Sequence, residues 1–150
     1  MQKIRIHTIG FTKKTAEHFF NELKKNGVIR VIDTRLNNNS QLSGFAKARD
    51  LEFFLKKICD IDYVYRSELA PTKKILDDYK NKKIDWEQYA QEYLNLMEQR
   101  LISSRLSSDE VDGCCLLCSE DKPHHCHRRL LAEYLKQQWS NQKTDINHIL

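Results

Sequence analysis

Apolar and polar residues recur along the chain in two alternating patterns, one typical of strands and one typical of helices. Residues 3–9 alternate between polar and apolar side chains, which predicts a strand. Residues 16–23 carry their large apolar side chains at the spacing of one helical face, and Gly27 ends that helix because glycine accepts the left-handed conformation. The β-branched residues 28–32 predict a second strand. A strand, a helix and a strand in this order favour a right-handed parallel unit.

The rest of the chain continues this alternation. Further strands are expected at residues 63–65, 114–118 and 145–150. Further helices are expected at residues 51–58, from Pro71 or Thr72 onward, along the aromatic and presumed core stripe at 86–97, and from Pro123 through 135. Polar loops are expected at residues 36–47 and 103–112. We therefore expect one α/β domain over residues 1–150, with a mostly parallel sheet of about five strands between layers of helices.

The composition describes an ordinary soluble domain with a mild excess of positive charge. The chain has 150 residues, of which 40% are hydrophobic and 31% are charged, and its net charge is +4. No apolar run approaches the roughly 20 residues that span a bilayer, and the N-terminal residues lack the apolar core of a signal peptide. We therefore expect a cytoplasmic protein with no membrane segment. The charge permits contact with phosphate or nucleic acid but is smaller than a dedicated nucleic-acid binder requires.

The cysteines do not resemble a disulfide framework. The chain has five of them, an odd number, and three are crowded into residues 114–118. Small secreted domains instead space an even number of cysteines along the chain. We therefore expect reduced thiols.

The densest group of reactive side chains follows the strand expected at residues 114–118. A thiol, a carboxylate, a second thiol, an imidazole and a guanidinium stand between Cys118 and Arg128. With a helix beginning here, these groups gather where a strand ends and a helix starts, which is where α/β sheets bind ligands. The sequence therefore predicts a ligand site without defining its chemistry.

Charged residues at two strand ends are candidates for acid–base and anion-binding roles. Asp33 and Arg35 follow the second strand, and Arg35 can grip phosphate or carboxylate bidentately. The alternative is a plain structural ion pair. Glu120 follows the fourth expected strand and in a parallel sheet would lie near Asp33, so the two carboxylates could share acid–base work or bind Mg²⁺. The alternative for Glu120 is a favourable charge at a helix N-terminus.

The triplet Cys126-His127-Arg128 falls in the first turns of the last expected helix. A cysteine at a helix N-terminus beside histidine and arginine has thiolate character, which makes Cys126, together with Cys118, a candidate nucleophile. The alternative is that Cys126 is a small buried residue in a tight turn. Zn²⁺ is disfavoured because Cys115 and Cys118 would point to opposite faces of a strand, which leaves only Cys118, Cys126 and a histidine as ligands.

Several short motifs resemble a known family in their order. They are Thr8-Ile9-Gly10, Asp33-Thr34-Arg35, Ser40, Leu117-Cys118-Ser119-Glu120, Cys126-His127-Arg128 and His148-Ile149. Over nearly its whole length the chain resembles the family called domain of unknown function 488. The resemblance implies a Rossmann-like α/β fold and adds Gly10 and Ser40 to the ligand-binding candidates. It implies no settled activity, although a link to nucleic acid has been suspected.

The chain departs from that family at two places. Members often have His-Ser after the first glycine, where this chain has Phe11-Thr12, and many have Gly-Gly where Leu69 here precedes Ala70-Pro71. Phe11 removes an imidazole, so we expect no mechanism that uses a histidine base at position 11.

These residues together predict an enzyme that acts on a phosphorylated substrate such as a nucleotide or nucleic acid. The expected catalytic residues are Asp33, Glu120, Cys118 and Cys126, and the expected ligand-binding residues are Gly10, Arg35, Ser40, His127 and Arg128. No cofactor is assigned; Mg²⁺ suits the carboxylates and Zn²⁺ fits poorly. Two alternatives stay open, namely a non-catalytic module that binds an anion or nucleic acid, and a thiol-redox or zinc-binding protein. The sequence does not fix the oligomeric state.

Overall fold

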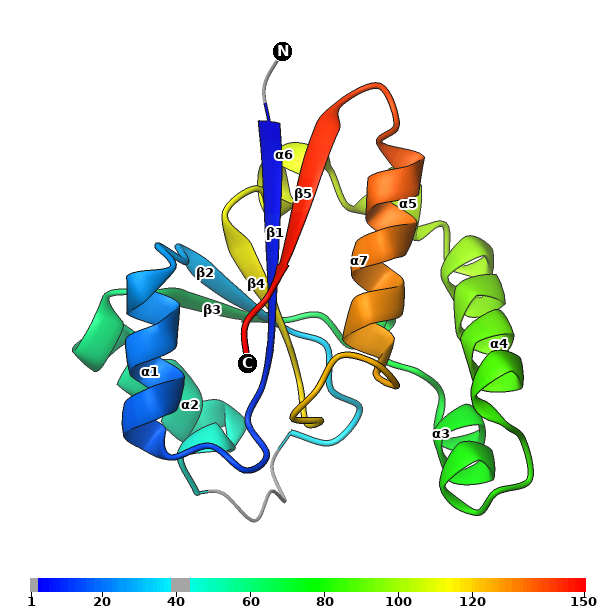
Figure 1. The fold of residues 1–150 in the computed structure, drawn as a ribbon, viewed down its shortest axis with the longest axis horizontal. Coiled ribbons are helices and arrows are strands. Elements are labelled where there is room, and N and C mark those ends of the chain that lie inside the picture. The colour runs from blue at the N-terminus through cyan, green and yellow to red at the C-terminus, as the bar shows by residue number, and fades with distance from the viewer. Residues whose placement is uncertain (1–2, 39–43) are drawn as a thin grey trace.

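A five-stranded sheet, parallel throughout, runs through the computed structural model, which describes residues 3–38 and 44–150 (Figure 1). Its strands are β1 (Lys3–Gly10), β2 (Arg30–Asp33), β3 (Asp62–Tyr65), β4 (Cys114–Cys118) and β5 (Lys143–His148). Their spatial order is β3-β2-β4-β1-β5. At the carboxyl edge, Gly10 is paired with Cys118 and Asp33 with Leu117. Three strand ends that carry predicted site residues therefore meet at this edge.

Helices cover both faces of the sheet. The helices are α1 (Ala16–Lys25), α2 (Ala48–Phe54), α3 (Lys73–Lys80), α4 (Trp86–Gln99), α5 (Ile102–Arg105), α6 (Ser108–Val111) and α7 (His127–Gln138). Shorter turns are η1 (Gly44–Ala46), the π-helical η2 (Leu55–Cys59) that extends α2, and η3 (Ser67–Leu69). In Figure 1, α1 and α2 lie on one side of the sheet, and α7 and α4 lie on the other. This is the predicted Rossmann-like, three-layer α/β fold.

The central strand β4 explains how the two faces divide. All of its residues are buried, as expected for a parallel strand covered on both faces. Cys114 and Leu116 pack with α4 and α7 in one apolar cluster, and Cys115 and Leu117 pack with α1 and α2 in the other. Because side chains alternate along a strand, Cys118 falls on the α7 face.

The helix starts follow from local capping. Thr15 accepts a hydrogen bond from the His18 amide at the start of α1, and Thr72 accepts one from the Ile75 amide at the start of α3. At the start of α4, Asp85 and Gln88 satisfy each other's backbone amides in a capping box. These short polar signals place the helices where the apolar stripes predict them.

Several predicted boundaries were wrong; the last strand, for example, spans Lys143–His148 instead of residues 145–150. Residues 103–112 are not a loop, because buried Ile102, Leu106 and Val111 anchor α5 and α6. The second strand begins at Arg30 rather than residue 28. The last helix begins at His127, because Cys126 is its N-cap and residues 119–125 are held as a loop by the contacts described below.

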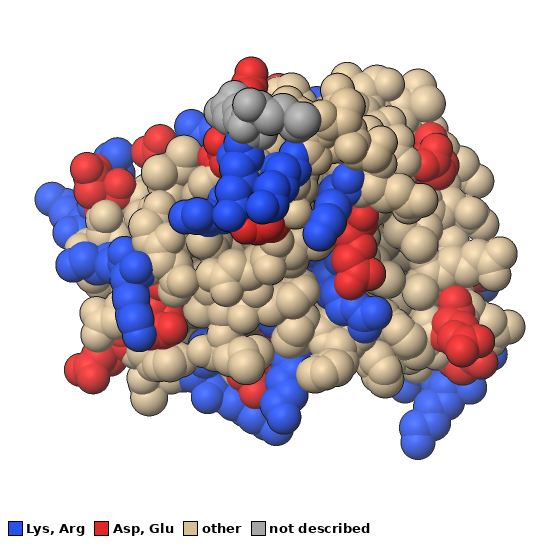
Figure 2. Space-filling view, turned by 45° about the horizontal axis from the view of Figure 1, so that its top comes forward, with Lys and Arg blue, Asp and Glu red and all other residues tan. Residues whose placement is uncertain are grey.

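The outer surface carries mixed charge. Basic and acidic side chains are interspersed over the face drawn in Figure 2. Several of the lysines pair with nearby acids, for example Lys73 with Asp77 and Lys74 with Asp78, at an i,i+4 spacing. Among the described residues, no helix combines the length and apolarity needed to cross a membrane.

Candidate active site at the carboxyl edge of the sheet

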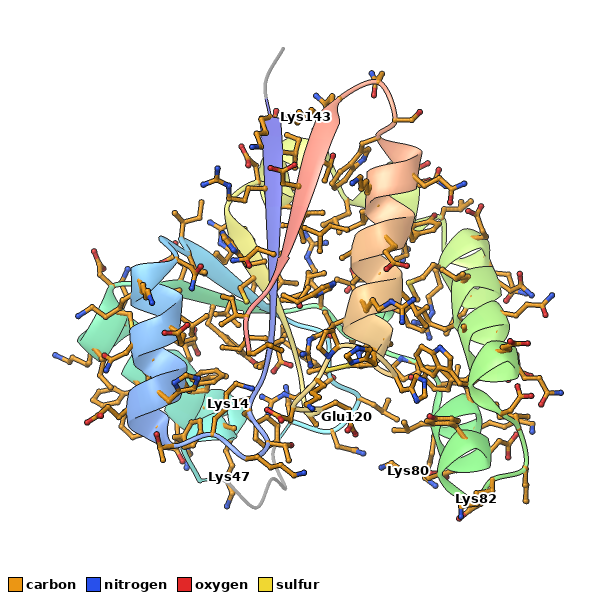
Figure 3. All side chains as sticks on the ribbon, viewed as in Figure 1. Lys14, Lys47, Lys80, Lys82, Glu120 and Lys143 are labelled. Carbon is orange, nitrogen blue, oxygen red and sulfur yellow. A yellow bond between two sulfur atoms is a disulfide. The ribbon has the colours of Figure 1, made fainter. Side chains whose placement is uncertain are left out.

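A cavity of about 330 Å³ opens where β2 and β4 end. Its lining comes from the segment after β2, from Pro71, from α3 and α4, and from the β4–α7 connection. The lining residues are Arg35, Leu36, Asn37, Pro71, Leu76, Tyr79, Lys80, Tyr89, Cys118, Ser119, Glu120, His125, Cys126 and His127. Figure 3 shows Lys80 on α3 and Glu120 on the β4–α7 loop, on opposite sides of this space. Five of the predicted catalytic and ligand-binding residues line it, namely Arg35, Cys118, Glu120, Cys126 and His127.

Asp33 and Arg35 form a buried ion pair at the end of β2. Arg35 Nε and Nη2 donate to the two carboxylate oxygens at 2.8 and 2.9 Å, and the Arg35 amide donates to Oδ1 at 3.1 Å. Tyr63 donates its hydroxyl to Oδ2 at 2.6 Å, and Asn38 donates to the same oxygen at 3.4 Å. Both Asp33 oxygens are therefore already occupied.

The face on which Asp33 lies explains why it does not join Glu120. Asp33 alternates with Ile32 and shares the face of Val31, which packs with α1 and α2. Glu120 instead follows Cys118 and lines the cavity, whereas Asp33 does not line it. Asp33 and Glu120, the expected pair of carboxylates, therefore do not line the cavity together.

One guanidinium nitrogen of Arg35 has no hydrogen-bond partner among the described residues. Its side chain is 2% exposed, it lines the cavity, and its Nη1 has no hydrogen-bond partner in residues 3–38 and 44–150. The guanidinium carbon lies 5.5 Å from the centre of the Phe11 ring. A buried guanidinium nitrogen without a partner costs free energy, and an anion in the cavity would remove that cost.

Arg128 is bonded in the opposite way. It is fully buried, and its Nε donates to Thr8 Oγ1 at 3.3 Å while Nη2 donates to the Asp121 carbonyl at 3.2 Å. Nη1 donates to the Glu120 carbonyl and to Cys118 Sγ, the latter at 3.2 Å. Burial lowers the pKa of Arg128 to about 10, still well above neutrality. Arg128 does not line the cavity, so the structure places it behind the wall as the group that shapes the β4–α7 loop.

Gly10 is part of the same arrangement. A Cβ at this position would lie 1.5 Å from the Glu120 carbonyl oxygen and 2.7 Å from Arg128 Nη1. Only glycine allows the loop to cross β1 this closely. Gly10 therefore supports the loop and lies outside the cavity lining, and Ser40, the other small residue predicted at the site, lies outside the described residues.

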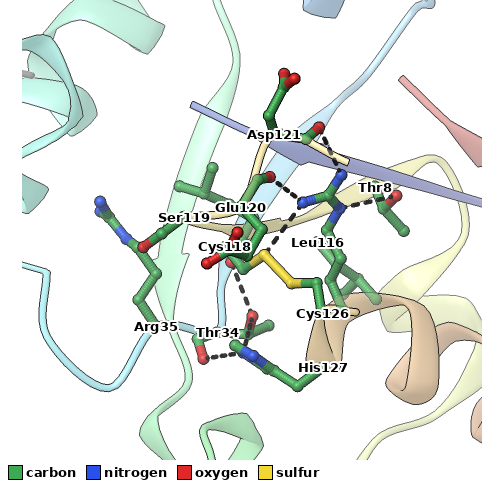
Figure 4. Close-up of a disulfide and its surroundings, with 12 residues drawn as sticks. Thr8, Thr34, Arg35, Leu116, Cys118, Ser119, Glu120, Asp121, Cys126 and His127 are labelled. Carbon is green, nitrogen blue, oxygen red and sulfur yellow. Dashed lines mark hydrogen bonds between the residues drawn. A yellow bond between two sulfur atoms is a disulfide. The ribbon is translucent and has the colours of Figure 1, made fainter. Parts of the chain in front are cut away.

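The prediction that all thiols are reduced was wrong for one pair. Cys118 and Cys126 are joined as a disulfide, and both line the cavity (Figure 4). Cys59, Cys114 and Cys115 are free. Burial raises the pKa of all three free thiols, that of Cys114 to about 11. Sequence spacing alone gave no sign of the pair, because the end of β4 and the N-cap of α7 meet only in the fold.

His127 is held in one tautomer beneath the cavity. Its Nε2 lies 2.8 Å from the Thr34 carbonyl oxygen and therefore carries a proton that it donates. The Thr34 hydroxyl donates to the Leu117 carbonyl at 2.8 Å, so it accepts from His127. Burial lowers the pKa of His127 to about 4, and the nearby charge of Arg128 acts in the same direction. His127 is thus neutral at pH 7, with its lone pair on Nδ1.

An aromatic wall completes the cavity, and the sequence did not assign it there. Tyr79 and Tyr89 line the space with ring centres 5.0 Å apart. Trp86 stacks between Tyr89 at 5.2 Å and His125 at 4.8 Å, so α4 is joined to the β4–α7 loop. The aromatic stripe of α4 was assigned wholly to the core, because helical spacing does not distinguish a core side chain from one that also borders a cavity.

The described residues hold few side chains that could bind a metal ion at the cavity. No group of three or more His, Cys, Asp or Glu side chains in the described ranges is placed to bind one ion. Glu120 is an exposed carboxylate on the wall, and Asp33 is bonded elsewhere. A Mg²⁺ ion would therefore depend on Glu120 and on oxygen atoms of a bound ligand.

The sequence was compared with known proteins. Residues 15–135 match a family described as Domain of unknown function DUF488. The chain belongs to this family. The match contains every cavity-lining residue of this DUF488 domain, whereas β1 and β5 lie outside it. No curated protein and no solved structure matches the chain.

Proposed function

We propose that this DUF488 domain is an enzyme that acts on a phosphorylated substrate, such as a nucleotide or one nucleotide of a nucleic acid. The observation that carries the proposal is buried Arg35, which lines the cavity and whose Nη1 has no hydrogen-bond partner in the described residues. A phosphoryl oxygen would accept from it, and Lys80 on the opposite wall would add a second positive charge.

The other walls suit the rest of a nucleotide. Tyr79, which is half-buried, offers an aromatic face on which a base can stack, and the buried Tyr89 supports it from behind. Glu120 and Ser119 offer oxygen atoms to the amino or hydroxyl groups of a base or sugar. The cavity volume is near the lower end of the roughly 300–1,000 Å³ typical of ligand pockets, so a nucleic acid would place a single unstacked nucleotide in it.

The reaction class that this arrangement supports is displacement at phosphorus. The thiolate of reduced Cys118 or Cys126 would form a bond to phosphorus while the bond to the ester oxygen breaks. Glu120, the carboxyl group on the wall, would carry the proton that the leaving oxygen needs. Water would then cleave the sulfur–phosphorus bond and release phosphate. In this proposal Asp33 positions Arg35, and Arg128 and Gly10 position the loop.

A conservative pair of variants tests the anion contact. Arg35→Lys keeps a cation beside Asp33 but lacks a second donor edge, and Arg105→Lys makes the same change on an exposed arginine. Thermal shift and calorimetry would use inorganic phosphate, the four common nucleoside monophosphates, and short single-stranded RNA and DNA. We expect one of these probes to stabilise the wild type and Arg105→Lys, and to bind Arg35→Lys about tenfold to a hundredfold more weakly. Equal binding by Arg35→Lys would remove the anion site.

A non-catalytic binding module is the second candidate. It is favoured by the complete occupation of the Asp33 carboxylate, which leaves Glu120 as the carboxylate on the cavity wall. The two candidates differ in phosphate release from the bound probe. An enzyme loses that release in Glu120→Gln while still binding the probe, whereas a binding module shows no release in either protein.

A further inference from the structure

The disulfide between Cys118 and Cys126 lies on the wall of the proposed substrate cavity. Cys118 is the last residue of β4 and Cys126 is the N-cap of α7. The two residues are 1% and 3% exposed, and both contribute to the cavity lining. A thiol reagent that enters the cavity therefore meets this bond.

The loop that the disulfide closes is held in place without it. The amide and hydroxyl of Thr12 donate to the Ser119 carbonyl, and Lys14 pairs with Asp121 Oδ1 at 3.0 Å. Further along, Arg129 Nη1 donates to the His124 carbonyl at 2.7 Å. The Arg128 bonds to Glu120 and Asp121 and the stacking of His125 on Trp86 add to these. Because these contacts do not depend on the disulfide, we expect the loop to keep its course when the bond is broken.

The surroundings favour both sulfur atoms as thiolates when the bond is broken. Arg128 Nη1 lies 3.2 Å from Cys118 Sγ and donates to it. Cys126 is at the N-terminus of the 12-residue helix α7, where the helix dipole stabilises negative charge. Cys114 and Cys115 are as deeply buried, but their thiols donate to the Glu110 and Leu116 carbonyls, and burial raises their pKa.

We propose that Cys118 and Cys126 are a redox-active pair that switches the site between a disulfide form and a dithiol form. A small dithiol serves as the reductant. Its thiolate attacks Cys126 Sγ, a bond forms between those two sulfurs, and the Cys118–Cys126 bond breaks. The electron pair goes to Cys118 Sγ, which leaves as a thiolate that Arg128 stabilises.

The second thiolate of the reductant completes the exchange. It attacks the reductant sulfur of the mixed disulfide, releases Cys126 as a thiolate, and leaves the reductant as a cyclic disulfide. Two electrons have then passed from the reductant to the protein. This inference rests on the proposed function in one respect: the dithiol form exposes the nucleophile to a bound substrate, and the disulfide form binds that substrate without converting it.

Counting thiols in oxidised and reduced dithiothreitol tests the pair. The protein is equilibrated, quenched in acid, unfolded, alkylated with iodoacetamide and weighed. We expect the oxidised wild type to take three alkyl groups, one on each free cysteine, and the reduced wild type to take five, one on each cysteine of the chain. Cys118→Ser and Cys126→Ser should take the same number in both buffers, and the control Cys59→Ser should keep the wild-type difference.

Two results would overturn the pair as a switch. One is full alkylation of the wild type in both buffers, which would show that no disulfide forms. The other is a melting temperature that collapses on reduction, which would make the bond a structural staple. We expect reduction to change the melting temperature by no more than a few degrees, because the other loop contacts persist.

Reactivity measures the role of Arg128 near Cys118. In Cys126→Ser, the remaining Cys118 should react with a chromogenic aromatic disulfide at pH 7 at least about tenfold faster than Cys59 does, because a stabilised thiolate is the attacking form. A rate no higher than that of Cys59 would contradict the proposed leaving-group role.

A final comparison separates this inference from the proposed function. Arg35→Lys should lose binding of the phosphate or nucleotide probe while keeping the difference of two alkyl groups between buffers. Cys118→Ser should keep probe binding and lose that difference. If the probe never binds any variant but the thiol count still changes, the redox pair stands and the phosphorylated substrate is wrong.

Discussion

Two buried arginines at the carboxyl edge of the sheet differ in how their donors are used. Arg128 is fully buried, and each of its three nitrogens donates to the protein. Arg35 is 2% exposed, and it spends Nε and Nη2 on Asp33 while Nη1 has no partner in the described part of the chain. Burial and charge are therefore the same in the two cases, and the unsatisfied donor is what separates a binding group from a structural one.

The two arginines also sit in different electrostatic settings. Arg35 faces a carboxylate, so the pair is close to neutral and Arg35 Nη1 can attract an anion. Arg128 hydrogen-bonds neutral carbonyls, a hydroxyl and a sulfur, and the carboxylates of Asp121 and Glu120 act on it only through space. We therefore propose the anion contact at Arg35 and the thiolate stabilisation at Arg128.

The largest expected effect is a loss of stability in Arg128→Lys, which we compare with the same substitution at Arg35. Arg128→Lys removes a fork that reaches Thr8, Cys118, Glu120 and Asp121 together, and the single nitrogen of a lysine cannot lie within bonding distance of all four. At about 1–3 kcal/mol for each bond that is lost, the free energy of unfolding should fall by roughly 3 kcal/mol. Urea denaturation at pH 7 measures it. Arg35→Lys should lower the free energy of unfolding by less than half as much. A larger loss in Arg35→Lys than in Arg128→Lys would contradict the structural role given to Arg128.

His127 precedes Arg128 in the chain and hydrogen-bonds the carbonyl of Thr34, the residue before Arg35, and its titration is the next largest effect. Its pKa in the folded protein is about 4, below the ordinary value of 6.5. The unfolded chain therefore binds the proton more readily, so this contribution to stability is complete above about pH 6.5 and is lost as the pH falls towards 4. Full loss is of the order of 3 kcal/mol.

The variant His127→Gln isolates this contribution. Its amide can still donate to the Thr34 carbonyl, but it does not titrate. We expect the wild type to lose more stability than His127→Gln between pH 6.5 and pH 4, as measured by urea denaturation at each pH. Parallel curves for the two proteins would show that His127 does not titrate in this range.

A methyl group added to Gly10 of β1 tests, by steric contact alone, how closely the β4–α7 loop that Arg128 holds lies against this strand. In Gly10→Ala the new Cβ meets the Glu120 carbonyl, a backbone atom, so the loop has to shift. Such overpacking costs about 1–3 kcal/mol. Gly44→Ala is the control, because a Cβ there meets nothing within 4 Å. Melting temperatures compare the two, and equal values would mean that the loop does not rest on β1.

The smallest expected effect comes from removing one hydrogen bond to Asp33, the ion-pair partner of Arg35. Tyr63→Phe removes the 2.6 Å donor to Asp33 Oδ2, while Arg35 and Asn38 remain. We expect a loss of about 1.5–2 kcal/mol in unfolding free energy with little change in affinity for the phosphate probe. In Tyr65→Phe the lost bond is a long one on an exposed ring, and stability should change by less than about 0.5 kcal/mol. A loss of probe binding in Tyr63→Phe would show that the hydrogen bond from Tyr63 to Asp33 controls how Arg35 Nη1 is placed.

Much of the fold could be predicted because it depends on local patterns. The buried run at residues 114–118 is observed as β4 with the predicted bounds, and the strand order places its end beside Gly10 and Asp33. The helix at 86–97 is observed as α4 because its stripe and its capping box agree. The boundary at Pro123 failed because the contacts that keep residues 119–125 out of the helix come from distant parts of the chain.

The site was predicted less completely than the fold. Arg35, Glu120, Cys118, Cys126 and His127 do line the cavity, as their positions at strand and helix ends suggested. Tyr79 and Tyr89 come from α3 and α4, which carry no polar motif that points to a site. The two departures from the family pattern also lie here, since Phe11 packs near Arg35 and Pro71 lines the cavity.

The sequence by itself determined the five strands, the longer helices and the gathering of reactive side chains after β4, because periodicity, caps and chemistry are local properties of the chain. Only the tertiary structure decided which arginine keeps a free donor and which two cysteines meet. Arg128 finds Thr8 across 120 positions of the chain and Tyr63 reaches Asp33 across 30. The partners of a buried polar group are chosen by packing, and no local pattern records them.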